Sequence, residues 1–364
     1  MIKTGKPWEQ VKKTNRKWQN HLKSTGFDAF MYSRLMMYSL SGPETDSTFN
    51  FKVQSDEENE LAKYWFNWME EFPYEIYLEI TNHCNLKCSM CTNEKLERDR
   101  GFMSDDLFKK IIDEVSIKRP VSYFHMYGIG DPLMDPDIMK KMEYSWKEKQ
   151  LSQVFGTNGK ALLKNDNYKV LVDMEIPIMT IDVDGFSKDT YEKIRVGGNF
   201  DKIIKTVETV YDYIRSTGSK TRLELIYLSV PDFNEHEVVS FVNWCEENEY
   251  EYKITSLHTW AENRSELSTS ERNPARTSPC RGLWGGLMIY WNGDVSTCFQ
   301  DADGFEIFGN VKEQSIQEIW QTSLRQRRQE HVKGTFRNLC HGCQSFLNSG
   351  LPKCNSIVYP EILR

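Results

Sequence analysis

"ITNHCNLKCSMCTN", residues 80–93, carries three cysteines in a CxxxCxxC arrangement directly after the strand-like run 75–80. These cysteines are Cys84, Cys88 and Cys91. A [4Fe-4S] cluster normally takes four cysteines. A loop with three thiolates therefore holds three irons of a cubane and leaves one iron open for a small chelating ligand. The alternative interpretation of the triplet is a structural zinc knuckle.

After this loop, helical stretches alternate with apolar strand candidates. The first helix begins with Ser104 as N-cap and with Asp105 and Asp106 in its first turn. Such alternation predicts parallel strands joined by crossover helices. Later strands are expected at 122–127, 152–156, 179–183, 222–229 and 252–256, and later helices near 136–147, 163–174, 201–217 and 235–248. These units are too few to close an eight-stranded barrel.

Polar motifs follow several of the expected strands. The segment 127–138, "YGIGDPLMDPDI", follows the second strand, and 156–160, "GTNGK", follows the third. The fourth strand ends in "TIDVDGFSKDTYEKIRVGG", residues 180–198. In α/β barrels the site lies at the C-terminal ends of the strands, which is also where the cysteine loop falls.

With these motifs the chain resembles the radical S-adenosylmethionine (SAM) superfamily. The resemblance implies an open partial (β/α)6 TIM-like barrel. It also implies that the amine and carboxylate of SAM bind the open iron, and that reductive cleavage releases a 5'-deoxyadenosyl radical. Two positions depart from the family pattern: Asp131 replaces the usual Glu, and Met90 stands where an aromatic residue usually precedes the third cysteine.

The resemblance also assigns SAM-binding roles. The turn with Asp131 holds the SAM ammonium, Asp182 contacts the ribose, and Arg195 pairs with the SAM carboxylate through its bidentate fork. The complete set of cofactor-binding residues expected in this way is Gly128, Gly130, Asp131, Pro132, Thr157, Asn158, Asp182 and Arg195.

Length and composition fit a metal-binding enzyme that does not bind nucleic acid. The 364-residue chain has a net charge of −7 and a pI near 5.7, and no basic stripe of the kind that a nucleic-acid backbone needs is visible. No apolar run is long enough to cross a membrane, so a cytoplasmic location is expected. Nine cysteines in such a compartment indicate metal binding rather than disulfides.

The C-terminal third carries a second cysteine set. Cys280 and Cys298 flank an expected hairpin with the turn Asn292-Gly293, and a helix with a Ser315/Glu318 capping box follows. Next come Cys340 and Cys343 in "CHGC". This set resembles the SPASM/twitch group, in its twitch form with one auxiliary [4Fe-4S] cluster. A zinc ribbon is the alternative.

The other cysteines receive different interpretations. Cys245 lies in phase with Val238 and Val242 and is expected to be a buried core thiol. Ser349 stands where a further cluster cysteine would be expected, and Cys354 alone does not complete a second auxiliary cluster. The expected organisation is a mainly helical N-terminal extension at 1–72, a radical SAM barrel at 73–265, and an auxiliary iron-sulfur domain at 266–364.

Two clusters together predict an oxidation. The adenosyl radical removes a hydrogen atom from the substrate, and the remaining electron passes to the auxiliary cluster once a neighbouring proton leaves. The expected substrate is a carbohydrate or aminocyclitol-like alcohol, and the expected electron donor is a flavodoxin or ferredoxin. The alternatives are a ribosomal peptide maturase and a non-catalytic iron-sulfur sensor. Candidates for the general base or for substrate contact are Asp184, Glu224, Tyr227, His258 and Glu262.

Overall fold

The computed structural model describes residues 70–73, 75–118, 123–230, 233–256, 280 and 282–343. One mixed sheet with the strand order β6-β5-β4-β3-β2-β1-β7-β8-β9 runs through this part of the chain. Strands β1 to β6 are parallel to their neighbours. The strands are β1 (Glu75–Leu78), β2 (Tyr123–His125), β3 (Gln153–Thr157), β4 (Ile178–Asp182), β5 (Arg222–Ser229), β6 (Glu251–Ser256), β7 (Gly286–Ile289), β8 (Asp294–Ser296) and β9 (Gly309–Asn310).

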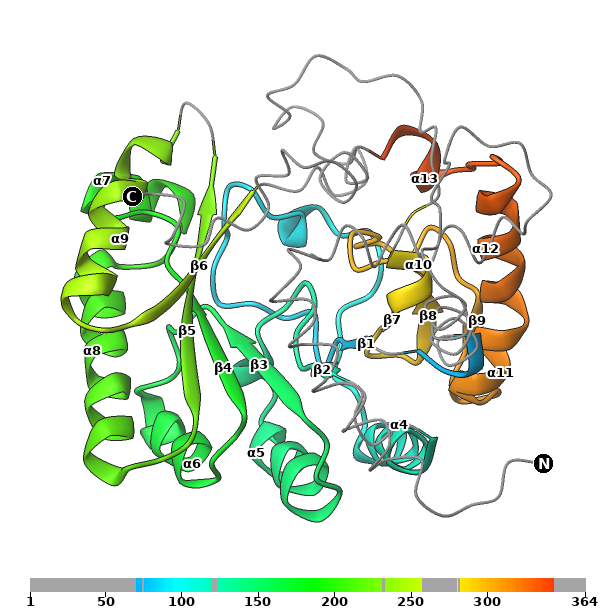
Figure 1. Ribbon diagram of the computed structural model, residues 1–364, viewed down its shortest axis with the longest axis horizontal. Helices are drawn as coiled ribbons and strands as arrows, with labels where there is room; N and C mark the ends of the chain where they lie inside the picture. The colour runs from blue at the N-terminus through cyan, green and yellow to red at the C-terminus, as the bar shows by residue number, and fades with distance from the viewer. Residues whose placement is uncertain are drawn as a thin grey trace, which may run out of the picture.

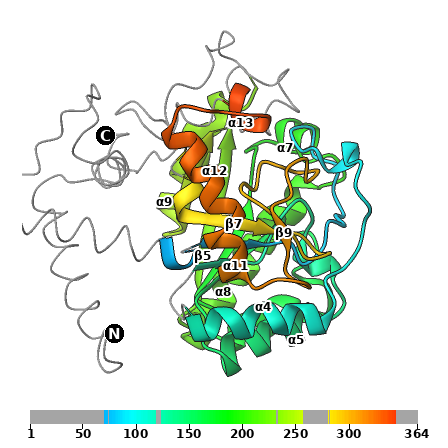
Figure 2. The ribbon, with the colours of Figure 1, turned by 90° about the vertical axis from the view of Figure 1, so that its right-hand side faces the viewer.

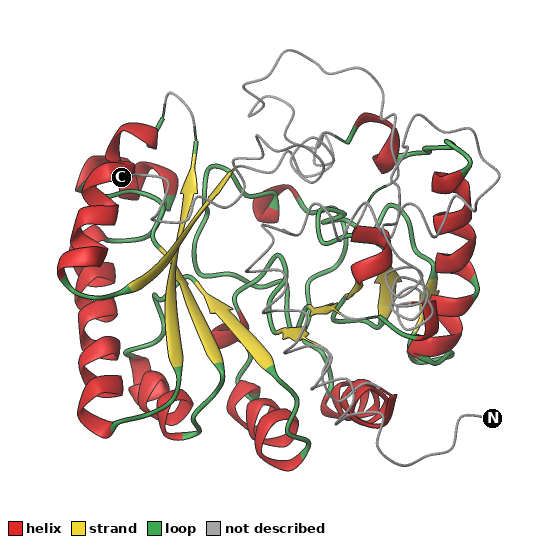
Figure 3. Cartoon of the chain, in the orientation of Figure 1, coloured by secondary structure: helices red, strands yellow, loops and turns green. Residues whose placement is uncertain are grey.

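The strands alternate with helices as the hydrophobic pattern predicts, and the sheet curves into an unclosed barrel with helices on its outer side (Figures 1 and 3). The α-helices are α4 (Asp105–Lys118), α5 (Ile138–Met142), α6 (Asn167–Asp173), α7 (Lys188–Ile194), α8 (Phe200–Thr217), α9 (Val238–Glu247), α10 (Gly282–Gly285), α11 (Ile316–Gln321), α12 (Ser323–Val332) and α13 (Leu339–Gly342). The shorter helical turns are η1 (Asn93–Lys95), η2 (Pro132–Met134), η3 (Glu143–Glu148), η4 (Lys164–Asp166) and η5 (Glu235–Glu237).

Helix α4 shows how the local sequence sets these elements. The Ser104 hydroxyl accepts the Leu107 amide at 3.3 Å, as the N-cap predicts. Phe108 and Ile112 are buried on the inward face of the helix, where they join the core with Ile76 and Phe124 of the first two strands. The outward-facing residues of each strand thus pack on the helices, and the alternate residues face the barrel interior.

The C-terminal hairpin differs from expectation in its attachment. β7 and β8 are antiparallel, and Gly293 adopts φ +92° in the turn, as the Asn-Gly signal predicts. However, β7 also pairs in parallel with β1, with Glu75 opposite Gly286. The hairpin therefore continues the barrel sheet at its β1 edge, and α11 and α12 lie beside it (Figure 2). Sequence patterns do not reveal such pairing between segments so far apart.

Two smaller expectations also have clear outcomes. Ser315 caps α11 by accepting the Glu318 amide at 3.0 Å, while the Glu318 carboxylate accepts the side-chain amide of Gln314 at 3.2 Å. Cys245 is fully buried on α9 and belongs to the core, as expected. The expected N-terminal extension, apart from 70–72, lies outside the described residues, as do Ser349 and Cys354.

A buried ion pair joins the barrel to the hairpin. The Arg98 guanidinium donates to both carboxylate oxygens of Glu79 at 2.6 and 2.5 Å, and its Nε donates to the Ala302 carbonyl at 2.6 Å. The Glu79 side chain is fully buried and that of Arg98 is 15% exposed. The Asp303 carboxylate also accepts the Glu97 amide at 2.8 Å. The Arg98 side chain therefore joins the loop that follows the three cysteines, the residue after β1 and the loop after Cys298.

We expect Arg98→Met to lower the free energy of unfolding by about 3–5 kcal/mol, because it leaves the Glu79 carboxylate buried without its partner. Denaturant unfolding of anaerobically purified protein measures this change. The matched control is Arg222→Met, whose ion pair with Glu251 is about half exposed and should contribute less than about 1 kcal/mol. Equal effects of the two changes would contradict a joining role for Arg98.

Candidate active site

The cysteine loop lies at the carboxyl end of the barrel, as the motif order predicts (Figure 1). Backbone bonds fix it there: the Lys87 amide donates to Val196 O at 2.9 Å, and the Ser89 amide donates to Ile194 O at 2.8 Å. The Asp131 amide donates to His83 O at 2.9 Å. The loops after β1, β2 and β4 therefore form one unit around the three thiols.

Gly130 is required by the close approach of two of these loops. A Cβ at this position would lie 2.2 Å from Thr81 O and 2.6 Å from His83 O. No side chain fits at such a distance. The turn after β2 can therefore lie against the cysteine loop only with glycine here.

Asp131 holds the turns after β2 and β3 together. One carboxylate oxygen accepts the Leu133 amide at 2.9 Å, and the other accepts the Thr157 hydroxyl and the Asn158 amide, both at 2.9 Å. The Asn158 side chain in turn donates to Asn85 at 2.8 Å and lies 3.7 Å from Cys84 Sγ. Burial raises the pKa of Asp131, and these three hydrogen bonds oppose the rise. The residues expected to bind SAM thus meet beside the cysteine loop.

Arg195 lies against the same loop. Its guanidinium is paired with Asp184 and, at 3.1 Å, with Asp182, and Nη1 lies 3.7 Å from Cys88 Sγ. Asp184 also accepts the Leu228 amide at 2.8 Å. The Asp182 side chain is 36% exposed and that of Asp184 is 1% exposed. Asp184 therefore fixes the guanidinium, whereas Asp182 is the partner that a bound carboxylate could replace.

The two cysteine sets suit multi-iron clusters. Burial raises the pKa of Cys88 to about 12, with Arg195 opposing the rise and Cys91 and Cys84 adding to it. Burial raises the pKa of Cys298 as well, and repulsion from the other three cysteines of its set, Cys280, Cys343 and Cys340, raises it further. Cys88 is thus near enough to Cys84 and Cys91, and Cys298 to Cys280, Cys340 and Cys343, for the charges of these thiols to affect its pKa. Iron bound to the thiols would supply the positive charge that buried thiolates need.

Single-metal geometry is not present in the described part of the chain. No three His, Cys, Asp or Glu side chains there are gathered closely enough to hold one metal ion. Three and four cysteines match the ligand numbers of an open and a fully ligated cubane.

The base candidates from the sequence fall in different places. Asp184 is committed to Arg195 and to the Leu228 amide. Glu224 alternates with the core residues Leu223 and Leu225 on β5, and therefore faces the interior. Tyr227 is on the opposite face, where its hydroxyl donates to Asn234 O at 2.8 Å and its ring packs 4.9 Å from that of Phe241. His258 and Glu262 lie outside the described residues.

Sequence reasoning missed the polar aromatic side chains of the interior. Tyr77 of β1 and His125 of β2 stack with ring centroids 4.4 Å apart, and Tyr127 lies edge-on to both. The alternation of Tyr123, His125 and Tyr127 with the buried Phe124 and Met126 was the available signal.

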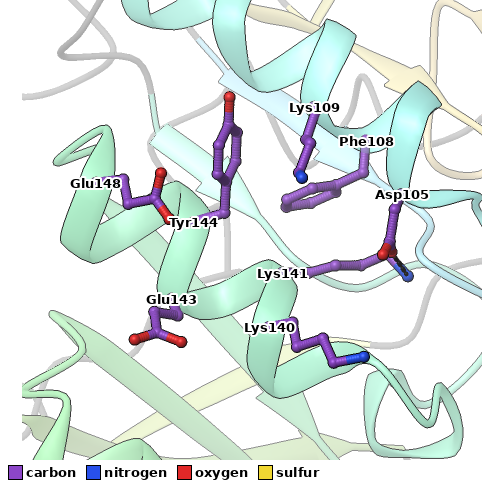
Figure 4. A pocket seen from close by; sticks show the side chains of 8 residues that line it. All are labelled: Asp105, Phe108, Lys109, Lys140, Lys141, Glu143, Tyr144 and Glu148. Carbon is purple, nitrogen blue, oxygen red and sulfur yellow. Dashed lines mark ion pairs between the residues drawn. The ribbon is translucent and has the colours of Figure 1, made fainter.

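A surface pocket between α4 and the α5–η3 segment is unrelated to this site (Figure 4). Several charges at this pocket pair within the helix layer: Lys141 lies 3.3 Å from Asp105 and 2.7 Å from Asp135. None of the residues predicted for the active site line it. The residues that line it are Asp105, Phe108, Lys109, Lys140, Lys141, Glu143, Tyr144 and Glu148.

Comparison with known families agrees with the geometry. A radical SAM superfamily model matches residues 78–245, and a model of the SPASM iron-sulfur cluster-binding domain matches residues 280–344. The chain belongs to the radical SAM superfamily. As a radical SAM protein with a SPASM domain, it binds iron-sulfur clusters and SAM. No helix in the described ranges is long and apolar enough to span a membrane.

Curated relatives match this radical SAM chain over different lengths. The AdoMet-dependent heme synthase of Methanosarcina barkeri is 25% identical over 328 residues, which are 76% of this chain and 93% of the relative. A tungsten-containing aldehyde ferredoxin oxidoreductase cofactor-modifying protein of Pyrococcus furiosus is 33% identical over 109 residues, or 30% of each chain. The chain thus spans under a third of the latter relative.

Solved structures share the fold at low identity. BtrN in complex with AdoMet and 2-DOIA has a TM-score of 0.53 and 18% identity, with 75% of this chain and 93% of that chain covered. Streptococcus suis SuiB bound to the precursor peptide SuiA has a TM-score of 0.59 and 15% identity, with coverage of 78% and 74%. These likenesses establish the unclosed barrel and leave the substrate open.

We expect anaerobically purified protein to contain about eight irons per chain, because three and four cysteines ligate two separate cubanes. Replacing Cys84, Cys88 and Cys91 by Ala should halve the iron and stop SAM cleavage. Iron and zinc analysis measures both metals. About four irons with stoichiometric zinc would contradict the auxiliary cluster.

We expect Asp131→Asn to lower the free energy of unfolding by about 1–3 kcal/mol. Both carboxylate oxygens of Asp131 accept hydrogen bonds, so the NH2 group of the Asn side chain would have to face an N–H or O–H donor and could not accept its hydrogen bond. SAM affinity should fall about tenfold as the turn loosens, while the iron content stays unchanged. Calorimetric titration with SAM measures the affinity. Asp137→Asn in the same loop, on the exposed pair with Lys140, should change neither property; equal losses in both variants would argue against the role of Asp131.

Proposed function

We propose that this chain is a radical SAM oxidoreductase that oxidises a carbohydrate or aminocyclitol-like alcohol and passes an electron to an auxiliary [4Fe-4S] cluster. The observation that carries the proposal is the presence, in one chain, of a three-cysteine loop in the radical SAM segment and of four further cysteines in the SPASM segment. The three-thiol set leaves an iron for SAM, and the four-thiol set leaves no iron open to substrate. The second cluster is therefore suited to electron uptake.

The residues around the first set are proposed to bind and orient SAM. With SAM bound, the open cluster supplies the radical that removes a hydrogen atom from the substrate. Asp131 keeps the turns after β2 and β3 in place, and Arg195, fixed by Asp184, offers its guanidinium to the SAM carboxylate. The proposed SAM site comprises Gly128, Gly130, Asp131, Pro132, Thr157, Asn158, Asp182 and Arg195. A flavodoxin or ferredoxin is the proposed reductant.

The interior surface supports a hydroxylated substrate. Tyr127 lies on this interior surface and has charged neighbours. Burial is the main cause that raises the pKa of Tyr127, and the charges of Asp182, Glu75 and Glu224 raise it further. Thr180 of β4 lies in the same layer, because a Cβ at Gly156 would lie 2.7 Å from the Tyr127 ring and 3.2 Å from the Thr180 hydroxyl. Hydroxyl, carboxylate and phenol groups offer many hydrogen bonds to a polyol and poor solvation to an apolar compound.

Peptide modification is the second candidate, since the fold is also that of SuiB, whose structure holds a precursor peptide. The deciding experiment is anaerobic reconstitution and chemical reduction with SAM, followed by mass analysis of 5'-deoxyadenosine and product. A panel of inositols, aminocyclitols and sugars tests the alcohol proposal, and peptides encoded beside the gene test the alternative. A carbonyl product two mass units lighter than a panel compound is the expected result. A reconstituted, reduced protein that never cleaves SAM would overturn both in favour of a sensor.

We expect Cys343→Ala to uncouple the two products: 5'-deoxyadenosine continues to form, while oxidised product falls at least tenfold because the substrate radical lacks its electron acceptor. Cys88→Ala should stop both products. Cys245→Ala, in the core of α9, is the matched cysteine control and should stop neither. Full product yield from folded Cys343→Ala protein would indicate a redox-neutral reaction.

A further inference from the structure

Three aromatic side chains form a cluster in the barrel interior, here named the Tyr77–His125–Tyr127 cluster. The Tyr77 and His125 rings are parallel within 9° with centroids 4.4 Å apart. The Tyr127 ring stands at 80° to that of His125, and its hydroxyl lies 3.1 Å from His125 Nδ1. Each contact restrains the imidazole, so its orientation in the barrel is fixed.

The cluster adjoins both the proposed SAM turn and the loop that carries Cys298. Tyr127 directly precedes Gly128 of the proposed SAM turn. On the other side, the Tyr77 ring packs 5.2 Å from Phe299, which directly follows Cys298. A substrate of the proposed reaction, which must react beside SAM and also give an electron to the second cluster, fits this region.

One polar atom of the cluster has no partner. Within the described part of the chain, His125 Nε2 is shielded from solvent and makes no hydrogen bond, whereas Nδ1 is engaged by Tyr127. A buried nitrogen without a partner destabilises the folded protein, and most such groups in proteins are satisfied. The cost would be recovered if a bound molecule supplied the missing partner.

The surroundings keep the imidazole neutral. Burial, with a smaller contribution from Lys253 of β6, lowers the pKa of His125 to about 4. Its other neighbours are Tyr77 of β1, Tyr127 of β2 and, across the β3 pairing, the apolar Val154. A neutral imidazole carries one donor and one acceptor nitrogen. Nε2 therefore either donates or accepts, depending on the tautomer.

We propose that His125 is a substrate-binding residue whose Nε2 hydrogen-bonds a hydroxyl group of the substrate between the two cysteine sets. The inference rests on the proposed alcohol oxidation and names the side chain that holds the alcohol. A hydroxyl suits this position because it both donates and accepts, and so pairs with either tautomer. The stacked Tyr77 ring and the Tyr127 hydroxyl fix the orientation of the His125 imidazole. The substrate hydroxyl that Nε2 binds is therefore held in one place.

Two amide substitutions separate this role from a structural one. In His125→Asn the amide reaches the position of Nδ1, so the Tyr127 contact is kept and the Nε2 contact is lost. In His125→Gln the longer side chain reaches the position of Nε2 and gives up the Tyr127 contact. His125→Phe keeps the stacking area and removes both nitrogens. His236→Asn, on the exposed turn η5, is the control.

The measurements are the calorimetric Kd of the reconstituted, SAM-loaded protein for scyllo-inosamine and for each panel compound that the unaltered protein oxidises, and the KM for product formation. We expect His125→Asn and His125→Phe to raise both constants about tenfold or more. His125→Gln should stay within about threefold of the unaltered protein. Melting temperature, iron content and substrate-free SAM cleavage should be unchanged.

Any other order of the variants overturns the inference. If His125→Asn kept substrate affinity and His125→Gln lost it, His125 would act through its contact with Tyr127. If all three His125 variants bound substrate equally well, the substrate would not touch the imidazole ring. If the unaltered protein neither binds nor oxidises any panel compound, the proposed function fails first, and this inference falls with it. That outcome is distinguishable, because it appears without any substitution.

Discussion

The buried pair between Arg98 and Glu79 is the interaction on which the arrangement of the two cysteine sets depends. Glu79 directly follows the first strand, and Arg98 lies in the loop that follows the first set. The same guanidinium donates to Ala302, four residues after Cys298, and lies 4.6 Å from the Tyr290 ring. Because a buried charge without its partner is costly, the barrel loop and the hairpin loop are held in one relative position.

Charge compensation explains why Arg195 and Asp184 are buried together beside the three-cysteine loop. Arg195 is buried beside Cys88, where its charge opposes the pKa rise that burial imposes on the thiol. Asp184 is buried with it, and burial raises the pKa of that carboxyl to about 6 while Arg195 opposes the rise. The pair keeps a cation next to a thiolate ligand without leaving an isolated charge in the interior. In the proposed SAM site, the same guanidinium would be available to the carboxylate of SAM.

The interior of the barrel differs from an ordinary packed α/β core. Strand residues that face the helices are apolar and fully buried, such as Phe124 and Leu225. On the inner face, histidine, tyrosine and charged side chains occupy the corresponding positions of β1, β2, β5 and β6. Polar groups at such positions reduce the stability that apolar packing would give. The proposed recognition of a hydroxylated substrate would account for their presence.

The sequence by itself determined the three-cysteine loop, the parallel β/α order, the strand-end motifs and the four-cysteine set, because each depends on local spacing or periodicity. Only the tertiary structure decided that β7 pairs with β1, that Asp131 ties two turns together and that Arg195 is held by Asp184. It also separated Glu224, which faces the interior, from Tyr227, which packs against the helices, and brought His125 between Tyr77 and Tyr127. These outcomes depend on contacts between segments far apart in the chain, and strand register sets which side chain faces inward, so no local pattern encodes them.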